Sequence, residues 1–68
     1  MSASYKKLWK LLIDKNLKKT DLIKEAGITS NIIARMGNHQ YIAMESLEKI
    51  CQALKCDIGD IVSFDEKL

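Results

Sequence analysis

Ser30, Asn31 and Arg35 are the side chains whose spacing most clearly indicates a role in recognition. In a helix over residues 30–36 they fall on the outward side, while Ile33 and Met36 fall on the opposite, apolar side. Hydroxyl, amide and guanidinium groups form hydrogen bonds, and the guanidinium also carries a positive charge. The pattern therefore predicts a polar surface that a partner molecule can read.

The residues just before this helix form the frame that would position it. A first short helix is predicted over about residues 19–25, and Gly27 can adopt the positive φ that ends it. Thr29 is placed to cap the second helix through its hydroxyl group. The apolar residues between the two helices are Leu22, Ile23, Ala26, Ile28, Ile33 and Met36. Two short helices joined by a glycine-containing turn predict a helix-turn-helix, whose second helix enters the DNA major groove.

Two longer apolar patterns flank this frame. From Ser4 to Lys15 apolar residues at helical spacing predict an amphipathic helix that Ser4 can cap, and from Met44 to Lys55 a second stripe predicts another. The stripes consist of Tyr5, Leu8, Trp9, Leu12 and Ile13, and of Met44, Leu47, Ile50, Cys51 and Leu54. We interpret Trp9 as a core or interface aromatic, with base stacking as the alternative.

The remaining segments complete the predicted fold. Residues 37–42 show no apolar period and indicate a loop. Asp57 can cap a short final helix whose inward-facing residues are Ile58, Ile61 and Val62. The chain is therefore predicted to be all-α, a compact five-helix bundle that forms a single domain over residues 1–68, with its core at about residues 5–62.

Composition and charge limit the class of protein. The 68 residues are 47% apolar and include no proline, so a packed helical core is expected. No apolar run approaches the roughly 20 residues that span a bilayer, and no signal peptide is evident, so we expect a soluble cytoplasmic protein. Residues 1–40 carry eight Lys or Arg against three Asp or Glu, while residues 41–68 carry three against six. This asymmetry suits a molecule with one side toward phosphates, although basic solvated faces are common.

Residues suited to catalysis or metal binding are few. His39 is the only histidine, and Cys51 and Cys56 are the only cysteines, so no metal site is predicted. The cysteines are interpreted as small buried thiols in a reducing compartment, although spacing alone also allows a disulfide. No catalytic constellation and no glycine-rich phosphate loop is present, so we expect no enzyme activity and no cofactor.

The order of these segments resembles a known family of DNA-binding domains. Its most specific parts are Leu22-Ile-Lys-Glu-Ala-Gly-Ile28 and Ser46-Leu-Glu-Lys-Ile-Cys-Gln-Ala-Leu54, which lie between an apolar first helix and a short last helix. From about Tyr5 to Val62 the chain resembles the Cro/phage-repressor (XRE-type) helix-turn-helix family, especially its compact stand-alone bacterial members. The resemblance implies a lambda-repressor-like fold with residues 30–36 as the recognition helix.

This resemblance implies roles for individual residues. Ser30, Asn31 and Arg35 match base-contacting positions, and arginine can bond bidentately to guanine, asparagine to adenine, and serine to either base type. Contacts to the DNA backbone are expected from Lys19, Thr29, Asn38, His39, Gln40 and Tyr41. For His39 the alternative is a solvated loop residue without a partner.

The chain also departs from the family pattern. Many relatives pair an arginine of the first helix with a glutamate just after the recognition helix, and the matching positions here are Leu12 and Gly37. Because both partners are absent together, neither charge is left alone in a partly buried site. Lys18 replaces the usual capping serine or asparagine, which predicts a weaker cap. Lys19 replaces a common glutamine, which predicts a charge-based phosphate contact.

These inferences favour a sequence-specific DNA-binding transcriptional regulator, a repressor or controller protein located at the nucleoid. We expect it to bind double-stranded DNA as a homodimer, because paired half-sites lie about one DNA turn apart. The last helix with Phe64, or the first helix around Trp9 and Leu11, would supply the interface. No small-molecule ligand, metal or membrane partner is expected. The alternative is a protein-interaction module that does not bind DNA, with an apolar patch drawn from Trp9, Leu11, Tyr41, Ile42 and Phe64.

Overall fold

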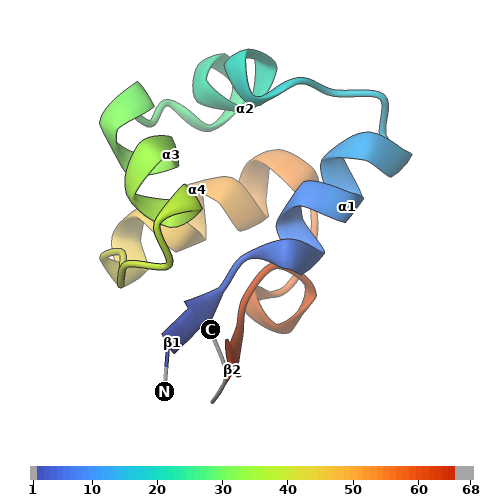
Figure 1. Cartoon of the computed structure of the whole chain (residues 1–68). Helices are drawn as coiled ribbons and strands as arrows, with labels where there is room; N and C mark the ends of the chain where they lie inside the picture. Colours follow the sequence, from blue (N-terminus) through green and yellow to red (C-terminus); the bar gives the residue numbers. More distant parts are fainter. Residues whose placement is uncertain (1, 66–68) are drawn as a thin grey trace.

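Four α-helices form most of the fold between residues 2 and 65, the part of the chain that the computed structural model describes. They are α1 (Lys6–Asp14), α2 (Lys19–Ala26), α3 (Ser30–Gly37) and α4 (Met44–Leu54). In Figure 1, α4 crosses the middle of the molecule, with α2 above it and α3 and α1 on either side. Because α2 packs against both α3 and α4, the helix-turn-helix rests on the core through its first helix.

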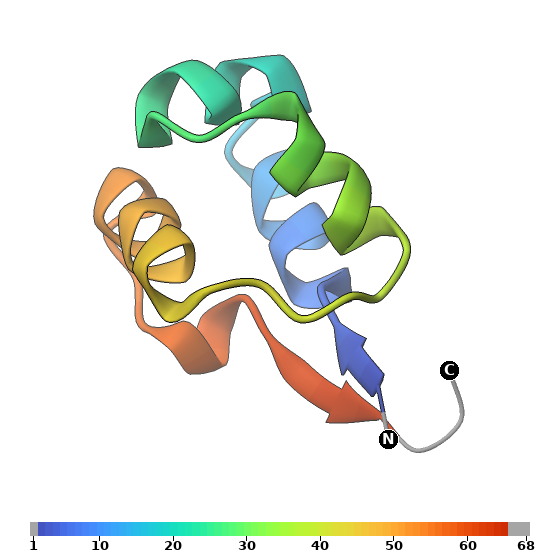
Figure 2. The ribbon, with the colours of Figure 1, turned by 90° about the vertical axis from the view of Figure 1, so that its left-hand side faces the viewer.

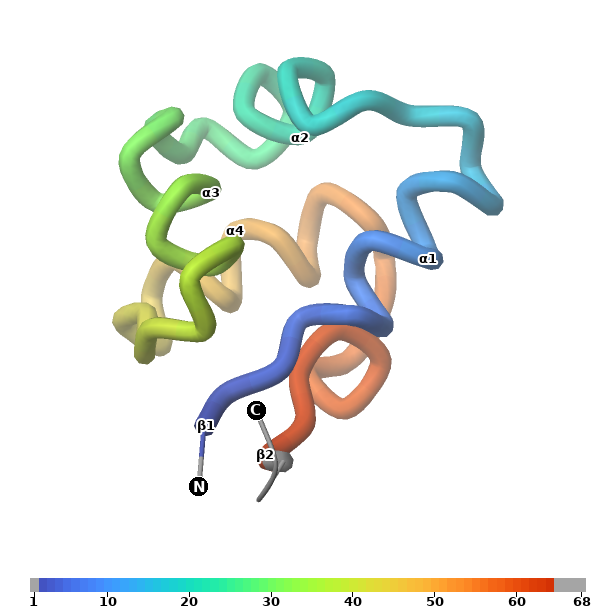
Figure 3. Tube along the Cα trace, in the orientation of Figure 1, coloured from blue at the N-terminus to red at the C-terminus, as the bar shows by residue number. Residues whose placement is uncertain are grey.

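A two-stranded antiparallel sheet joins the two ends of the described chain. Strand β1 (Ser2–Ser4) pairs with strand β2 (Ser63–Asp65), and Ala3 lies opposite Phe64. The tube in Figure 3 shows the two ends side by side below the helices. This pairing holds the segment that leads into α1 close to the last turn of the fold.

The predicted fifth helix is wrong. Ile58–Asp60 form a single 3₁₀ turn, η1, and the chain then extends into β2. Asp57 does not begin an α-helix; its backbone N–H donates to the Asp60 carboxylate at 3.0 Å. Gly59 is a poor helix former, and pairing with β1 gives residues 63–65 backbone hydrogen bonds in an extended conformation. The described chain therefore has four α-helices in place of the expected five.

The predicted cap of the first helix is one residue away from the N-cap position. Ser4 belongs to β1 and Tyr5 occupies the N-cap position, although the Ser4 hydroxyl accepts a hydrogen bond from the Lys6 N–H at 3.5 Å. Pairing with β2 keeps residues 2–4 extended, so α1 begins only at Lys6. A helix start that seemed to be set by a local cap is set by a strand partner at the other end of the chain.

The core lies between the helices and confirms most of the predicted apolar stripes. Its buried residues are Ala3, Tyr5, Leu8, Leu12, Leu22, Ile28, Ile33, Met36, Ile42, Leu47, Ile50, Leu54 and Ile61. Three residues that were expected to face inward are exposed instead: Ile13 by 76%, Met44 by 69% and Ile58 by 39%. Each lies at or next to the end of its helix, where neighbouring elements no longer cover the apolar side.

Cys51 and Cys56 are free, half-buried thiols at the C-terminal end of α4. Lys55 adopts a left-handed φ of 55°, and the N–H groups of Lys55 and Cys56 both donate to the Cys51 carbonyl. This arrangement closes the helix and brings residues 51 and 56 together, as helix C-caps commonly do. Burial, with a smaller contribution from the neighbouring Cys56, raises the pKa of Cys51 to about 11. The Cys51 thiol is therefore protonated at neutral pH. The closeness of residues 51 and 56 follows from the way α4 ends.

Candidate nucleic-acid interface

The turn that precedes α3 is set by two residues, as the sequence predicts. Gly27 has a φ of 69°, in the left-handed region that glycine adopts without steric cost, and its N–H donates to the Ile23 carbonyl. Thr29 is the N-cap of α3, and its hydroxyl accepts a hydrogen bond from the Ile32 N–H at 3.3 Å. Ile28, between them, is buried. The turn therefore sets the direction in which α3 starts, and the Ile32 N–H in its first turn has a hydrogen-bond acceptor.

The outward side of α3 carries the three predicted recognition residues. Ser30, Asn31 and Arg35 are exposed, whereas Ile33 and Met36 on the opposite side are buried. Figure 2 views the molecule from the side of α3 and shows this helix in front of α1. Ala34 is also exposed and lies one turn after Ser30, so it belongs to the same surface. Ala34 carries only a methyl group, so the pattern of hydrogen-bonding side chains in the sequence does not indicate it.

Arg35 does not extend freely from α3, which the sequence did not predict. Its Nε donates to the side-chain oxygen Oε1 of Gln40, and its Nη2 donates to the backbone carbonyl of Tyr41, both at 3.2 Å. The guanidinium therefore lies against the segment that follows α3. Two of its five N–H donors are engaged there, and three remain for another partner.

The segment of residues 38–43, called here the post-α3 loop, carries four of the predicted backbone contacts. Asn38, His39, Gln40 and Tyr41 are all exposed, and Tyr41 is exposed by 63%. His39 adopts a left-handed φ of 61°, which turns the chain back toward the core. Figure 2 shows the loop passing beside the junction of β1 and α1 before it enters α4. The loop therefore follows directly on α3 and exposes four polar side chains next to the end of that helix.

Two contacts anchor the post-α3 loop to the core. The side chain of Ile42 is 9% exposed and belongs to the buried cluster. The hydroxyl of Tyr5 donates to the Gln40 carbonyl at 2.6 Å, and Tyr5 itself is 2% exposed. Burial raises the pKa of the Tyr5 hydroxyl and outweighs the opposing effect of the nearby Arg35 charge, so this donor keeps its proton at neutral pH. Tyr5 therefore positions the loop through its hydroxyl, a role that its place in an apolar stripe does not indicate.

Lys19 lies at the start of α2 and contacts an aromatic ring. Its ammonium is 4.5 Å from the centroid of the Trp9 ring, a cation–π distance. Trp9 is half-buried and packs against the core, which agrees with its interpretation as a core aromatic. Its ring is covered by Lys19, so base stacking is disfavoured. The contact thereby holds the ammonium near the first turn of α2, where the N–H groups of a helix have no partner within the helix itself.

The N-terminus of α2 is capped without a side chain from its N-cap residue. Lys18 occupies that position, and its backbone N–H donates to the Asp21 carboxylate at 2.9 Å. The expected weak cap is therefore partly compensated by an acidic residue in the first turn, which also favours the helix dipole.

The two positions that differ from the family pattern lie in different environments. Leu12 is 3% exposed in the core, while Gly37 is the exposed last residue of α3. A side chain at Gly37 would meet no atom within 4 Å. No buried charge is left behind at either position. The connection between α1 and the region after α3 is made instead by Tyr5 and Gln40.

The frame of α2, turn and α3, with a polar outward side on α3, defines a helix-turn-helix protein. The sequence of residues 7–67 matches the family described as the Cro/C1-type HTH DNA-binding domain, so the chain belongs to that family. The resemblance seen in the sequence is confirmed. No helix among residues 2–65 is long and apolar enough to cross a membrane.

A solved structure supports the same assignment. The crystal structure of the transcriptional regulator VanUg, form II, is similar to this chain with a TM-score of 0.86 and 40% sequence identity. The similarity covers 91% of this chain and 83% of that one. No curated protein matches the chain.

Proposed function

We propose that this protein is a transcriptional regulator that binds double-stranded operator DNA sequence-specifically, as a homodimer in the cytoplasm. The observation that carries the proposal is the exposed polar side of α3 on a Cro/C1-type helix-turn-helix frame. The similarity to a transcriptional regulator supports the regulatory role. Binding would place α3 in the major groove, where an α-helix fits and base edges are distinguishable.

Base recognition is assigned to the outward side of α3. Arg35 would bond to guanine, Asn31 to adenine, and Ser30 to either type of base. The exposed methyl group of Ala34 is suited to contact a thymine methyl. These roles use groups that are exposed and on one side of the same helix.

Backbone recognition is assigned to groups on both flanks of α3. Lys19, with the N-terminus of α2, would contact a phosphate on one flank, and Thr29, at the start of α3, would contact the backbone separately. On the other flank Asn38, His39 and Tyr41 would face the backbone, whereas the side-chain oxygen of Gln40 accepts a hydrogen bond from Arg35. The excess of Lys and Arg in residues 1–40 supports this orientation.

Dimerisation is assigned to the β2 end of the molecule. Phe64 is 64% exposed on β2, whereas the other candidates, Trp9 and Leu11, are half-buried against the core. Sedimentation at micromolar concentration tests this assignment, with Phe64→Lys as the variant and Ile13→Lys, another exposed apolar position, as the control. We expect the dimer fraction to fall only with Phe64→Lys. A monomer at all concentrations, with and without DNA, would remove the dimer from the proposal.

The interaction-module alternative is less well supported. Of its five patch residues, Ile42 is buried and Trp9 and Leu11 are half-buried, so only Tyr41 and Phe64 are largely exposed. Two exposed aromatic residues do not form the continuous apolar patch that such a module requires.

Electrophoretic mobility shift on the DNA upstream of the gene, at two salt concentrations, tests the proposal. We expect a specific complex that weakens at higher salt. Arg35→Ala should reduce discrimination at one base pair by ~1–3 kcal/mol. Lys19→Gln should weaken binding to all sequences and lower the salt slope by about 1. The absence of a specific complex at either salt concentration would refute sequence-specific binding there.

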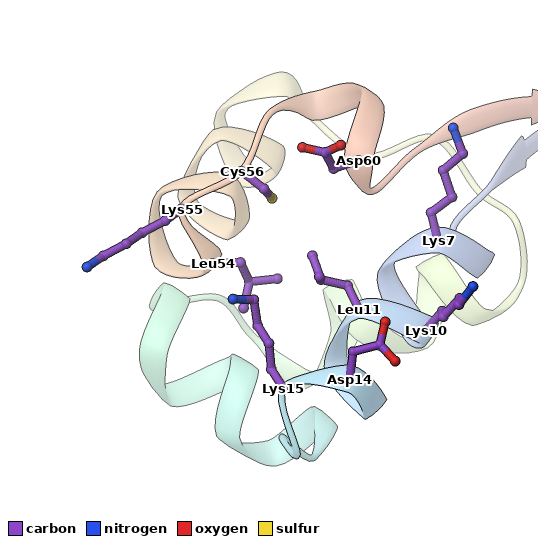
Figure 4. A pocket seen from close by; sticks show the side chains of 9 residues that line it. All are labelled: Lys7, Lys10, Leu11, Asp14, Lys15, Leu54, Lys55, Cys56 and Asp60. Carbon is purple, nitrogen blue, oxygen red and sulfur yellow. The ribbon is translucent and has the colours of Figure 1, made fainter.

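Lys10→Gln provides a matched control for the lysine variant. Lys10 lies on α1, beside the open groove that Leu11, Lys55 and Asp60 also line (Figure 4). The variant removes the same charge at a position away from α2 and α3. We expect it to change affinity less than Lys19→Gln does. Equal losses would show that net charge alone determines the phosphate interaction.

A further inference from the structure

Arg35 is held by the post-α3 loop in a defined direction, and the inference drawn from this rests on the proposed function. Nε and Nη2 of Arg35 both donate to the loop, to Gln40 Oε1 and to the Tyr41 carbonyl. We propose that Gln40 is a positioning residue that sets the direction of the Arg35 guanidinium for base recognition.

Gln40 is suited to this role because three of its groups are fixed. Its backbone N–H donates to the Arg35 carbonyl at 3.1 Å, and its backbone carbonyl accepts the Tyr5 hydroxyl at 2.6 Å. Its side-chain oxygen accepts from Arg35 Nε at 3.2 Å. Since Tyr5 is 2% exposed, the glutamine is connected to a rigid part of the core. Arg35 is thereby oriented by a residue five positions further along the chain.

The two hydrogen bonds to the loop leave three of the five guanidinium N–H groups for another partner. Nε and Nη2 share the side edge of the planar group, and both donate to the loop. The end edge carries Nη1 and the second Nη2 hydrogen. Two parallel donors on that edge match the O6 and N7 acceptors of guanine. An arginine that is already oriented also loses less side-chain freedom when it binds.

This role differs measurably from the phosphate contact that the sequence predicts for Gln40. A phosphate contact stabilises complexes with all sequences equally, because phosphates carry no base information. A positioning residue affects only the base pair that its arginine reads. If Gln40 contacts a phosphate, its substitution weakens binding to all sequences. If Gln40 positions Arg35, its substitution changes discrimination at one base pair only.

The experiment compares binding of the full chain to its preferred DNA and to every single-base variant of that DNA. The preferred site is first selected from random double-stranded oligonucleotides, and dissociation constants are measured by fluorescence anisotropy. The proteins are wild type, Arg35→Ala, Gln40→Ala and the double variant. Asn38→Ala, an exposed neighbour in the loop, is the control.

Arg35→Ala should lose about 5- to 150-fold discrimination at one base pair. Gln40→Ala should lose about 2- to 12-fold at the same base pair, the equivalent of one hydrogen bond. In the Arg35→Ala background, Gln40→Ala should cause no further loss of discrimination. Asn38→Ala should weaken binding to all sites by the same factor. Uniform weakening by Gln40→Ala, additive with Arg35→Ala, would overturn the positioning role and support a phosphate contact.

A conservative variant separates orientation from folding. Gln40→Glu keeps an acceptor for Arg35 Nε, so base preference should be retained, while the added negative charge lowers affinity for all sites. If Gln40→Glu loses discrimination as Gln40→Ala does, the acceptor role is refuted.

A measurement without DNA tests the contact by itself. Arg35 is the only arginine of the chain, so its side-chain Nε–H gives one assignable NMR signal. In wild type and Gln40→Glu we expect slow exchange of this proton with water, and in Gln40→Ala fast exchange. Equal exchange in all three proteins would overturn the inference, even if sequence-specific binding is confirmed. A wild-type protein that selects no DNA sequence would refute the proposed function instead, together with the role that depends on it.

Discussion

The two ends of α3 are held in different ways. At its start, the turn of residues 27–29 depends on neighbours in the sequence: Gly27 supplies the left-handed φ, and Thr29 caps the Ile32 N–H. At its end, the post-α3 loop depends on a distant residue. Tyr5 lies 35 positions from Gln40 and donates to its carbonyl. One end of the proposed recognition helix is therefore encoded locally, and the other is set by the folded core.

Because of this difference, the stability of the turn and the direction of Arg35 on the outward side of α3 depend on different residues. Substitutions in the turn act on the angle between α2 and α3. Substitutions of Tyr5 act on the loop, and through Gln40 on the direction of Arg35, but not on the turn of residues 27–29.

The largest effects are expected from the two isoleucines that anchor these regions. Ile28 in the turn and Ile42 in the loop are 7% and 9% exposed. Each change to alanine should lower the free energy of unfolding by about 2–4 kcal/mol, because it removes buried methyl groups and leaves a cavity. Urea denaturation measures both. Met44→Ala, at an exposed position, should change it by less than about 0.5 kcal/mol. A small loss for Ile42→Ala would mean that the core does not hold the loop.

Gly27→Ala should destabilise the turn by about 1–2 kcal/mol. A Cβ atom there meets nothing within 4 Å, so the loss comes only from the left-handed backbone. Thermal denaturation followed by circular dichroism measures the change. Gly59→Ala is the matched control, since its added Cβ also meets nothing and its φ is not positive. If both variants lose the same stability, conformational strain is not the cause.

Tyr5→Phe should lower the free energy of unfolding by about 1 kcal/mol, since it removes one hydrogen bond and leaves the Gln40 carbonyl without its donor. Amide hydrogen exchange should become faster in residues 38–41 and stay unchanged in residues 27–32. Faster exchange in both segments would show that the two ends of α3 are not independent.

The Tyr5 hydroxyl also predicts a pH dependence. Burial raises its pKa above the ordinary value of 10.0, so the folded state holds the proton at a pH where the unfolded state has released it. Stability from this group is complete below about pH 10 and is lost as the pH rises further. Wild type should therefore lose stability above pH 10 more steeply than Tyr5→Phe. Parallel curves would contradict the assigned burial of the hydroxyl.

The smallest effect is expected at His39, the left-handed residue of the loop. His39→Gly should raise the free energy of unfolding by about 0.5 kcal/mol, because relief of backbone strain exceeds the added freedom of the unfolded chain. Asn38→Gly, at a φ of −98°, should lower it by about 0.5–1 kcal/mol. Losses in both variants would indicate that the His39 side chain itself contributes to folding.

Much of the candidate site was predicted from local patterns. The helical period separated exposed Ser30, Asn31 and Arg35 from buried Ile33 and Met36. The order of the segments also identified the family. The exposed and buried sides of α3 involve residues within about one helical turn of each other, so their spacing is visible in the sequence itself.

Only the tertiary structure determines the conformation at both ends of the described chain and in the loop after α3. A three-residue strand is too short to show an alternating pattern, and the partner of β2 is at the opposite end of the described chain. For this reason the expected last helix became a turn and a strand. The direction of Arg35 follows from Gln40 and, through it, from Tyr5. Sequence alone therefore determined which residues face outward from α3, and contacts between distant residues determined where the last of them points.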